Sequence, residues 1–229
     1  MDSQPESDLK HQIFEQFARI CKALGSAWRF ELLELLAQGE HTVEALARET
    51  GMSFANTSQH LKNLRSARLV DASRRRTEMH YRLADETVFQ LLQAIQDIAE
   101  ARLAEVDRII ARLNEDRASM EPVTFEELRG ILHTDSSNIL IIDVRPSSEY
   151  LTGHIPGTQS YPLVTLETDY EQLPLDSQVI ACCRGYYSFL ADQAVNLLQS
   201  KGYTARRINQ GFAEWKAAGF PVEQGLPIE

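Results

Sequence analysis

The fold of the first half of the chain is decided by residues 41–83, HTVEALARETGMSFANTSQHLKNLRSARLVDASRRRTEMHYRL. Thr42 is suited to cap a short helix, and Gly51 is suited to end it because glycine tolerates a left-handed backbone. Ser53 then begins a second helix, in which Leu61 and Leu64 face the core. Two short helices joined by a tight turn predict a helix-turn-helix.

A basic hairpin follows the second helix. Residues 69–72 and 79–83 alternate as short strands around the polar tip 73–78, SRRRTE. A hairpin in this place is the wing of a winged helix-turn-helix.

Charge is distributed unevenly along the 229 residues. The whole chain has a net charge of −10, which argues against indiscriminate binding of nucleic acid. Residues 41–83 nevertheless carry eight basic and four acidic side chains. Such a basic island in an acidic chain is typical of a DNA-binding segment. The basic residues are Arg48, Lys62, Arg65, Arg68, Arg74, Arg75, Arg76 and Arg82.

The second helix and the wing supply the candidate DNA contacts. Short polar and basic side chains suit base edges and phosphates, and arginines at a wing tip suit the DNA backbone or the adjacent minor groove. The alternative is a solvated polar helix with a charged turn. The candidates are Ser53, Asn56, Thr57, Gln59, His60, Lys62 and Asn63 on the helix, and Arg74, Arg75 and Arg76 on the wing.

Helices are expected on both sides of this segment. Residues 9–24 and 29–37 have apolar side chains at helical spacing, and residues 85–117 predict one long helix with an apolar stripe. A helix of that length exceeds what a small domain covers, so we expect it to form a homodimer. The alternative is a solvated linker helix.

The periodicity changes after residues 118–122, ASMEP. Residues 138–144 and 179–182 are continuous apolar runs, which is typical of buried parallel strands, and residues 188–200 predict a helix. The sequence therefore predicts an α+β protein of two domains. A winged helix-turn-helix that binds DNA and dimerises spans 1–117, and an α/β domain with a parallel sheet spans 123–229.

The second domain contains a cysteine loop, CCRGYYS, at 182–188. It lies between a buried strand and a helix, where backbone N–H groups can wrap an anion and lower the pKa of a thiol. Neighbouring strand residues point to opposite sides, so Cys183, at the mouth of the loop, is the candidate nucleophile and Cys182 the candidate core residue. The expected sulfur-binding or anion-binding loop consists of Arg184, Gly185, Tyr186, Tyr187 and Ser188.

The first half resembles the ArsR/SmtB family of bacterial winged-helix repressors over roughly residues 10–113. The resemblance is carried by KALGSAWRFELLELLAQGEHTVEALARETGMSFANTSQHLKNLRSARLV (22–70) and RRRTEMHYRLAD (74–85). It implies a dimer that binds double-stranded operator DNA and leaves it when an inducer is bound. The cysteine or histidine ligands of the family's metal sensors are missing from helices 42–50 and 85–117, so we expect no metal.

The second half resembles the rhodanese family of sulfurtransferases over roughly residues 123–225. The matching segments are IIDVRPSSEYLTGHIPGT (141–158), VIACCRG (179–185) and INQGFAEWKAAGFPV (208–222). The resemblance implies that Cys183 carries a persulfide between a sulfur donor and an acceptor. It also implies a structural role for Asp143 and Arg145, and a place in a turn for His154.

The loop departs from the thiosulfate-type pattern of the family. Glycine comes two residues after Cys183, and two tyrosines occupy the middle of the loop. One loop cation, Arg184, favours a low-molecular-weight persulfide over thiosulfate as the donor. The tyrosines either admit such a donor or narrow the pocket.

Three cysteines are too few for a disulfide framework, and we expect a reducing, cytoplasmic setting without cofactor or membrane. The polar, acidic segment MDSQPESDLKHQ does not resemble a secretory signal. Cys21 is interpreted as a core residue, with a thiol sensor as the alternative, and Cys21 and Cys182 are possible redox partners of Cys183.

Three functions remain open at this point. The leading hypothesis is a repressor that responds to reactive sulfur or redox state through Cys183. The second is a sulfurtransferase whose helical half only dimerises or localises it. The third is a regulator whose α/β domain is an inert partner-binding module.

Overall fold

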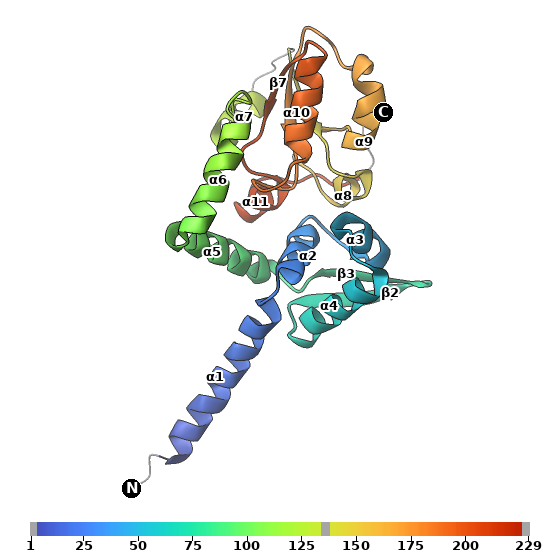
Figure 1. Cartoon of the computed structure of the whole chain (residues 1–229). Coiled ribbons are helices and arrows are strands. Elements are labelled where there is room, and N and C mark those ends of the chain that lie inside the picture. The colour runs from blue at the N-terminus through green and yellow to red at the C-terminus, as the bar shows by residue number, and fades with distance from the viewer. Residues whose placement is uncertain (1–3, 134–137, 226–229) are drawn as a thin grey trace. The chain divides into compact units, whose positions relative to one another are not determined.

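A computed structural model describes residues 4–133 and 138–225, so the first three residues of the acidic N-terminal segment lie outside the described part. The chain forms two compact units, Met1–Ala94 and Ile95–Glu229 (Figure 1). It contains helices and both kinds of sheet, in the α+β organisation that the sequence predicts.

The first unit is a winged helix-turn-helix. Its antiparallel sheet has the strand order β1-β3-β2. Fully buried leucines of α2, α3 and α4, among them Leu32, Leu46, Leu61 and Leu64, form its core. The elements are α1 (Gln4–Leu24), α2 (Ala27–Ala37), β1 (His41–Thr42), α3 (Val43–Thr50), α4 (Phe54–Ser66), β2 (Val70–Arg75), β3 (Glu78–Leu83) and the first part of α5 (Glu86–Arg102).

The expected helix caps are confirmed. Thr42 Oγ1 accepts a 3.1 Å hydrogen bond from the N–H of Ala45, and Ser53 Oγ accepts one of 3.3 Å from the N–H of Asn56. Gly51 ends α3 at φ +70°, a left-handed conformation that costs glycine no steric clash. These local signals fix the turn between α3 and α4.

The tip of the hairpin is shorter than expected. The strands pair as far as Arg75 opposite Glu78, so only Arg76 and Thr77 form the turn, with Arg76 at φ +54°. The expected tip at 73–78 was therefore wrong. The cross-strand register continues through Ser73, whose partner is His80.

The expected single helix over 85–117 was also wrong. The chain forms α5 (Glu86–Arg102) and α6 (Ala104–Asp116), separated by Leu103 in an extended conformation at φ −105° and ψ 105°. Leu103 acts as the residue that caps α6, because its carbonyl accepts from the N–H groups of Val106 and Asp107. Helix α6 and the end of α5 belong to the second unit.

The second unit is an α/β domain with a parallel sheet in the order β5-β4-β6-β7. The predicted strands are present as β4 and β6, and the helix expected over 188–200 is α10. The elements after α6 are α7 (Phe125–His133), β4 (Ile139–Asp143), α8 (Ser147–Thr152), β5 (Gln159–Ser160), α9 (Leu163–Asp169), the 3-10 turn η1 (Tyr170–Gln172), β6 (Gln178–Cys182), α10 (Leu190–Ser200), β7 (Thr204–Arg207) and α11 (Phe212–Ala217).

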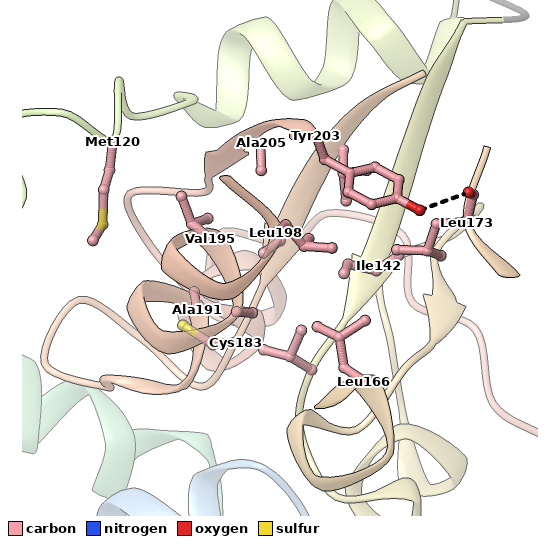
Figure 2. Close-up of a cluster of buried hydrophobic side chains, with 14 residues drawn as sticks. Met120, Ile142, Leu166, Leu173, Cys183, Ala191, Val195, Leu198, Tyr203 and Ala205 are labelled. Atoms are coloured by element: carbon pink, nitrogen blue, oxygen red, sulfur yellow. Dashed lines mark hydrogen bonds between the residues drawn. The ribbon is translucent and has the colours of Figure 1, made fainter. Parts of the chain in front are cut away.

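Each face of this sheet has its own hydrophobic cluster. One contains Cys183 with side chains of α9 and α10, and Figure 2 shows Cys183 beside Ala191. The other contains Cys182 with Leu128 of α7 and Trp215 of α11. The two neighbouring cysteines therefore lie on opposite faces, as the alternation of strand residues predicts.

Within the described residues, none of the helices combines the length and apolar content that a bilayer-spanning segment requires. Nor do three His, Cys, Asp or Glu side chains of this described part come together in a way that could hold a metal ion.

Candidate functional site

The polar face of α4 is the first candidate site. Ser53, Asn56, Gln59 and Lys62 are exposed on it, as expected. Gln59 Nε2 donates a 3.2 Å hydrogen bond to Asn63 Oδ1, one turn later on the same face. This face offers the donors and acceptors that base edges in a major groove require.

Two expected DNA contacts of α4 are placed differently. Thr57 is fully buried, and its hydroxyl donates to the carbonyl of Ser53 at 3.0 Å, so its expected exposure was wrong. His60 is half-buried. Thr57 lies on the face of α4 that packs on the core. Its hydroxyl bonds the helix backbone there and is not available to DNA.

The wing arginines differ in their surroundings. Arg75 Nη1 forms a 2.8 Å ion pair with Glu40 Oε1, and Nδ1 of His80 lies 3.2 Å from the same oxygen. Arg74 and Arg76 are exposed. Arg75 is therefore less available to DNA than Arg74 and Arg76, because Glu40 balances its charge.

A basic groove lies between the end of α4 and the hairpin. It has a volume of about 580 Å³, and its lining includes Arg65, Arg68 and Arg82. Arg82 donates to Asp71 at 2.8 Å, whereas Arg65 and Arg68 form no ion pair with any described residue. Arg65 and Arg68 were counted in the basic island but not among the expected contacts. Their position suits them to hold a DNA phosphate.

Cys183 is the centre of the second candidate site. It follows β6, is 0% exposed, and its thiol donates to the carbonyl of Gly185 at 3.5 Å. Burial raises the pKa of Cys183, and hydrogen bonding from the backbone of Gly185 and the charge of Arg207 only partly oppose it. The expected lowering of this pKa was therefore wrong, because desolvation of a thiolate outweighs the donors around it.

Cys182 is the less reactive neighbour. Burial raises the pKa of Cys182 well above its usual value, and the carboxylate of Asp143 adds to this effect. Its side chain lies in the cluster of the opposite face. The geometry therefore favours Cys183 over Cys182 as a nucleophile.

Arg184 does not supply a free positive charge to the loop. Its Nη2 forms a 2.6 Å ion pair with Oε1 of Glu149, and its Nε lies 3.1 Å from both carboxylate oxygens. This pairing could not be predicted from the loop, because Glu149 lies 35 residues earlier on α8. The expected role of Arg184 as an anion ligand is thus weakened by a buried carboxylate.

Glu214 of α11 lies against the Cys183 loop at Gly185. A Cβ added at Gly185 would lie 2.6 Å from Glu214 Oε1, so a larger residue there would displace the end of the Glu214 side chain. Glu214 accepts a 3.1 Å hydrogen bond from the N–H of Gly211, and burial raises its pKa. A carboxyl group so close to the loop was missed by the sequence analysis.

The loop tyrosines point to the helices that precede the α/β domain. Tyr186 Oη donates to Asn114 Oδ1 of α6 at 2.7 Å, and Tyr187 Oη donates to Glu100 of α5. The two rings meet edge to face at 5.2 Å. Ser188, the last loop residue, has its carbonyl 3.4 Å from Nη2 of Arg117. The tyrosines thus connect the loop to α5 and α6.

Asp143 and Arg145 hold the end of β4, as the resemblance implies. Both are fully buried, and Arg145 Nη2 donates to Asp143 at 2.6 Å and to the carbonyl of Gly153 at 2.8 Å. His154 stacks on Tyr150 at 3.7 Å, and its Nδ1 lies 2.9 Å from the Tyr150 carbonyl oxygen.

Cys21 is exposed on α1, so its interpretation as a core cysteine was wrong. It lies on a helix whose apolar side chains Leu9, Ile13, Phe14 and Phe17 are all at least half exposed.

A basic winged helix joined to a parallel α/β domain with a cysteine loop defines a DNA-binding regulator that carries a second, sulfurtransferase-like module. Residues 28–72 match the model of the bacterial regulatory proteins of the arsR family, and residues 124–218 match the rhodanese-like domain. The chain belongs to the ArsR family of transcriptional regulators and has a C-terminal rhodanese-like domain.

Similar proteins cover the whole chain or one half of it. The HTH-type transcriptional regulator Rv0324 of Mycobacterium tuberculosis is 37% identical over 223 residues, which is 97% of either chain. Thiosulfate sulfurtransferase GlpE of Pseudoalteromonas translucida is 26% identical over 85 residues, 37% of this chain and 79% of that protein. A solved structure from Mycobacterium bovis, the homodimeric winged helix-turn-helix domain of a possible ArsR-family regulator, is 42% identical. It covers 42% of this chain and 89% of its own, with a TM-score of 0.40.

Proposed function

We propose that this chain is a cytoplasmic, homodimeric repressor that releases its operator DNA when Cys183 carries sulfane sulfur. The observation that carries the proposal is the pair of hydrogen bonds from Tyr186 and Tyr187 to α6 and α5. Through them, the loop that surrounds Cys183 contacts the helices that follow the winged helix in the chain.

The chemical step is transfer of one sulfur atom. The thiolate of Cys183 attacks the outer sulfur of a low-molecular-weight persulfide, the S–S bond of the donor breaks, and its thiol leaves. The products are a Cys183 persulfide and the reduced donor thiol. With thiosulfate as the donor, the leaving group is sulfite. The backbone N–H groups of Gly185 in the loop and of Ala191 in the first turn of α10 favour the negative charge on the sulfur.

A persulfide at Cys183 requires the loop to change shape. The thiol is fully buried against Ala191 and bonded to Gly185, so a well-packed interior leaves little room for another sulfur atom. We expect the loop to expand at Tyr186 and Tyr187, which face α6 and α5. Expansion there weakens the bonds to Asn114 and Glu100.

Dimerisation is proposed to use the helical segment 85–117. Ile98, Leu103 and Ile109 are exposed on α5, α6 and the break between them, although each is a large apolar side chain. The face of α1 that contains Phe14 offers a second apolar surface. We propose 1–117 as the DNA-binding and dimerisation domain, 118–122 as the linker and 123–229 as the rhodanese-like domain.

The proposal is tested by DNA affinity at one fixed salt concentration, since salt alone changes this affinity by decades. The DNA upstream of the gene is titrated with reduced chain and with polysulfide-treated chain. Treatment is expected to weaken binding at least about tenfold, a coupling of about 1.4 kcal/mol. Cys183→Ser is expected to abolish the response, and the matched variants Cys182→Ser and Cys21→Ser are expected to keep it. A Cys183→Ser chain that still responds contradicts the proposal.

A second candidate function is sulfur transfer as an enzyme. It is supported by the match of residues 124–218 to rhodanese-like domains and by the place of Cys183 at the end of β6. In this case the helical half dimerises or localises the enzyme. Thiocyanate formation from thiosulfate or a persulfide at a useful rate, together with weak DNA binding that ignores sequence, would support it over regulation. If a chain truncated after Arg117 regulates fully, the rhodanese-like domain is an inert partner-binding module instead.

A further inference from the structure

Two buried arginines share one carboxylate next to the cysteine loop. Arg117 caps the C-terminal end of α6, and Arg207 is the last residue of β7. They are only 7% and 2% exposed. Arg117 Nη2 and Nε donate to Asp192 Oδ2 at 2.7 and 3.0 Å, and Arg207 Nε lies 3.1 Å from Asp192 Oδ1.

Asp192 does not satisfy the two guanidinium groups. Among the described residues, Nη1 of Arg117 and both Nε and Nη2 of Arg207 are buried without a hydrogen-bond partner, so the contact of Arg207 with Asp192 is an ion pair of poor hydrogen-bond geometry. Two positive charges also face one negative charge. Unpaired buried N–H groups and an uncompensated charge are both costly, which favours a further anionic acceptor.

A pocket lies at these unpaired groups. Its volume is about 240 Å³, and its lining includes Arg117, Arg207, Asn114, Asn209, Met120 and Pro122. Asn114 accepts from Tyr186 through its oxygen, which leaves its amide N–H groups as donors. Among the described residues, no carboxylate lines the pocket. The wall therefore offers donors and positive charge.

We propose that this pocket binds a small oxyanion of the phosphate or sulfate class. Guanidinium groups offer paired donors that match the oxygens of such anions, and two arginines beside an asparagine amide surround one ligand from several sides. The negative charge of the bound anion adds to that of Asp192 and compensates the two arginines. None of residues 183–188 lines the pocket, although Asn114 and Arg117 of its wall contact the loop at Tyr186 and Ser188. Anion binding does not require the sulfur chemistry proposed for Cys183.

The test is titration calorimetry of the full chain with sodium phosphate and with sodium sulfate, at ionic strength kept constant with chloride. Neither anion can donate sulfane sulfur, so reaction at Cys183 does not contribute to the heat. Saturable binding of one anion per chain is expected. Arg207→Gln is expected to weaken it at least about tenfold, because it removes one of the two guanidinium groups.

The neighbouring arginine is the matched control. Arg206 pairs with Glu127 at 2.6 Å, and its side chain does not line the pocket; it touches the lining through a 3.3 Å hydrogen bond to the carbonyl of Pro122. Arg206→Gln is therefore expected to bind the anion as the unmodified chain does. Cys183→Ser is expected to do the same.

If Arg207→Gln fails to fold, Asn114→Asp decides the question. It keeps an acceptor for Tyr186 but adds a negative charge to the wall, so binding is expected to weaken by a similar factor. Absence of saturable binding, or binding that is unchanged in Asn114→Asp and in a folded Arg207→Gln, overturns the proposal.

Discussion

The hydroxyl of Tyr186 donates a 2.7 Å hydrogen bond to the side-chain oxygen of Asn114, which joins the Cys183 loop to α6. The guanidinium of Arg117, which ends the same helix, lies 5.1 Å from the centre of the Tyr186 ring. One side chain of the loop thus makes a polar and a cation–π contact with the end of α6. A change of the loop at Tyr186 therefore alters its contacts with α6, which precedes the rhodanese-like region 124–218.

Tyr186→Phe tests this connection. The variant keeps the ring but loses the bond to Asn114, so we expect a small loss of stability, about 0.5–1.5 kcal/mol. The effect of polysulfide on DNA affinity is expected to fall from about tenfold to about threefold or less, while the affinity of the reduced chain stays unchanged. Binding isotherms of both forms measure it.

Tyr170→Phe is the control for this variant. Tyr170 also has a hydroxyl contact, 3.4 Å to its exposed neighbour Glu171, but it lies in η1, before β6 rather than after it. It is expected to leave the polysulfide effect intact. An equal loss of the polysulfide effect in both variants would contradict a specific role of Tyr186 in coupling the loop to DNA binding.

Local patterns predict the scaffold well. The capping residues Thr42, Gly51 and Ser53 interact only with backbone a few positions away. Each takes the expected place at the end of a helix. The opposite faces of Cys182 and Cys183 also follow from strand alternation alone. Both domains could therefore be predicted from the sequence.

The errors concern groups whose partners are distant in the chain. Arg75 pairs with Glu40, 35 residues away, and the loop cation Arg184 pairs with Glu149. The pKa of Cys183 is raised because its burial comes from the whole sheet and from α10, which the loop sequence does not reveal. The break at Leu103 has no glycine or proline beside it, so helical periodicity alone could not predict it.

The wing arginines are expected to contribute unequally to DNA binding. Arg74 is exposed, so Arg74→Ala should weaken binding to all sequences and reduce the slope of log affinity against log salt by about 1. Arg75→Ala should have a smaller effect on the affinity and on the salt slope, because Glu40 already balances the charge of Arg75. Filter binding or anisotropy at several salt concentrations measures the slopes. Equal slopes for the two variants would contradict this difference.

Thr57 and Asn56 separate a core role from a DNA contact. Asn56→Ala removes an exposed amide from α4 and should cost about 1–3 kcal/mol of discrimination between DNA sequences. Thr57→Ser keeps the buried hydroxyl bond to Ser53 and should leave DNA affinity unchanged. Competition between operator and unrelated DNA is the measurement. Loss of discrimination in Thr57→Ser alone would reverse the assignment.

Asp192→Asn should destabilise the second unit strongly. It leaves the buried guanidinium groups of Arg117 and Arg207 without a counter-charge, an effect of about 3–5 kcal/mol. Glu127→Gln, which removes a half-exposed partner of Arg206, should cost less than about 1 kcal/mol. Urea unfolding followed by Trp215 fluorescence in a Trp28→Phe background compares them. Similar losses of unfolding free energy in both variants would show that the buried cluster of Asp192, Arg117 and Arg207 contributes no more to stability than the exposed ion pair of Arg206.

The raised pKa of Cys183 predicts a defined pH dependence. The folded state holds the thiol proton more tightly than the unfolded state, whose thiol ionises at about pH 8.5. The contribution to stability is therefore complete below that pH, and the free energy of unfolding falls as pH rises above it. Cys183→Ser should make the free energy of unfolding decrease less steeply with rising pH.

Alkylation by iodoacetamide gives a second measure of the same group. The rate at Cys183 should rise about tenfold per pH unit between pH 7 and 8.5, because only the thiolate reacts. The exposed Cys21 should react first at neutral pH, and peptide mass spectrometry separates the two. A rate at Cys183 that is already constant at pH 7 would contradict a raised pKa.

DNA affinity is proposed to depend on whether Cys183 is a thiol or a persulfide. The most direct test divides one preparation, of which half is treated until intact mass shows the gain of one sulfur atom at Cys183, and compares operator binding of the two halves at one salt concentration. The persulfide form is expected to bind the operator at least about tenfold more weakly, and a thiol reductant is expected to restore the affinity. Equal affinities of the two verified forms would contradict it and leave the regulator and the rhodanese-like domain with separate functions.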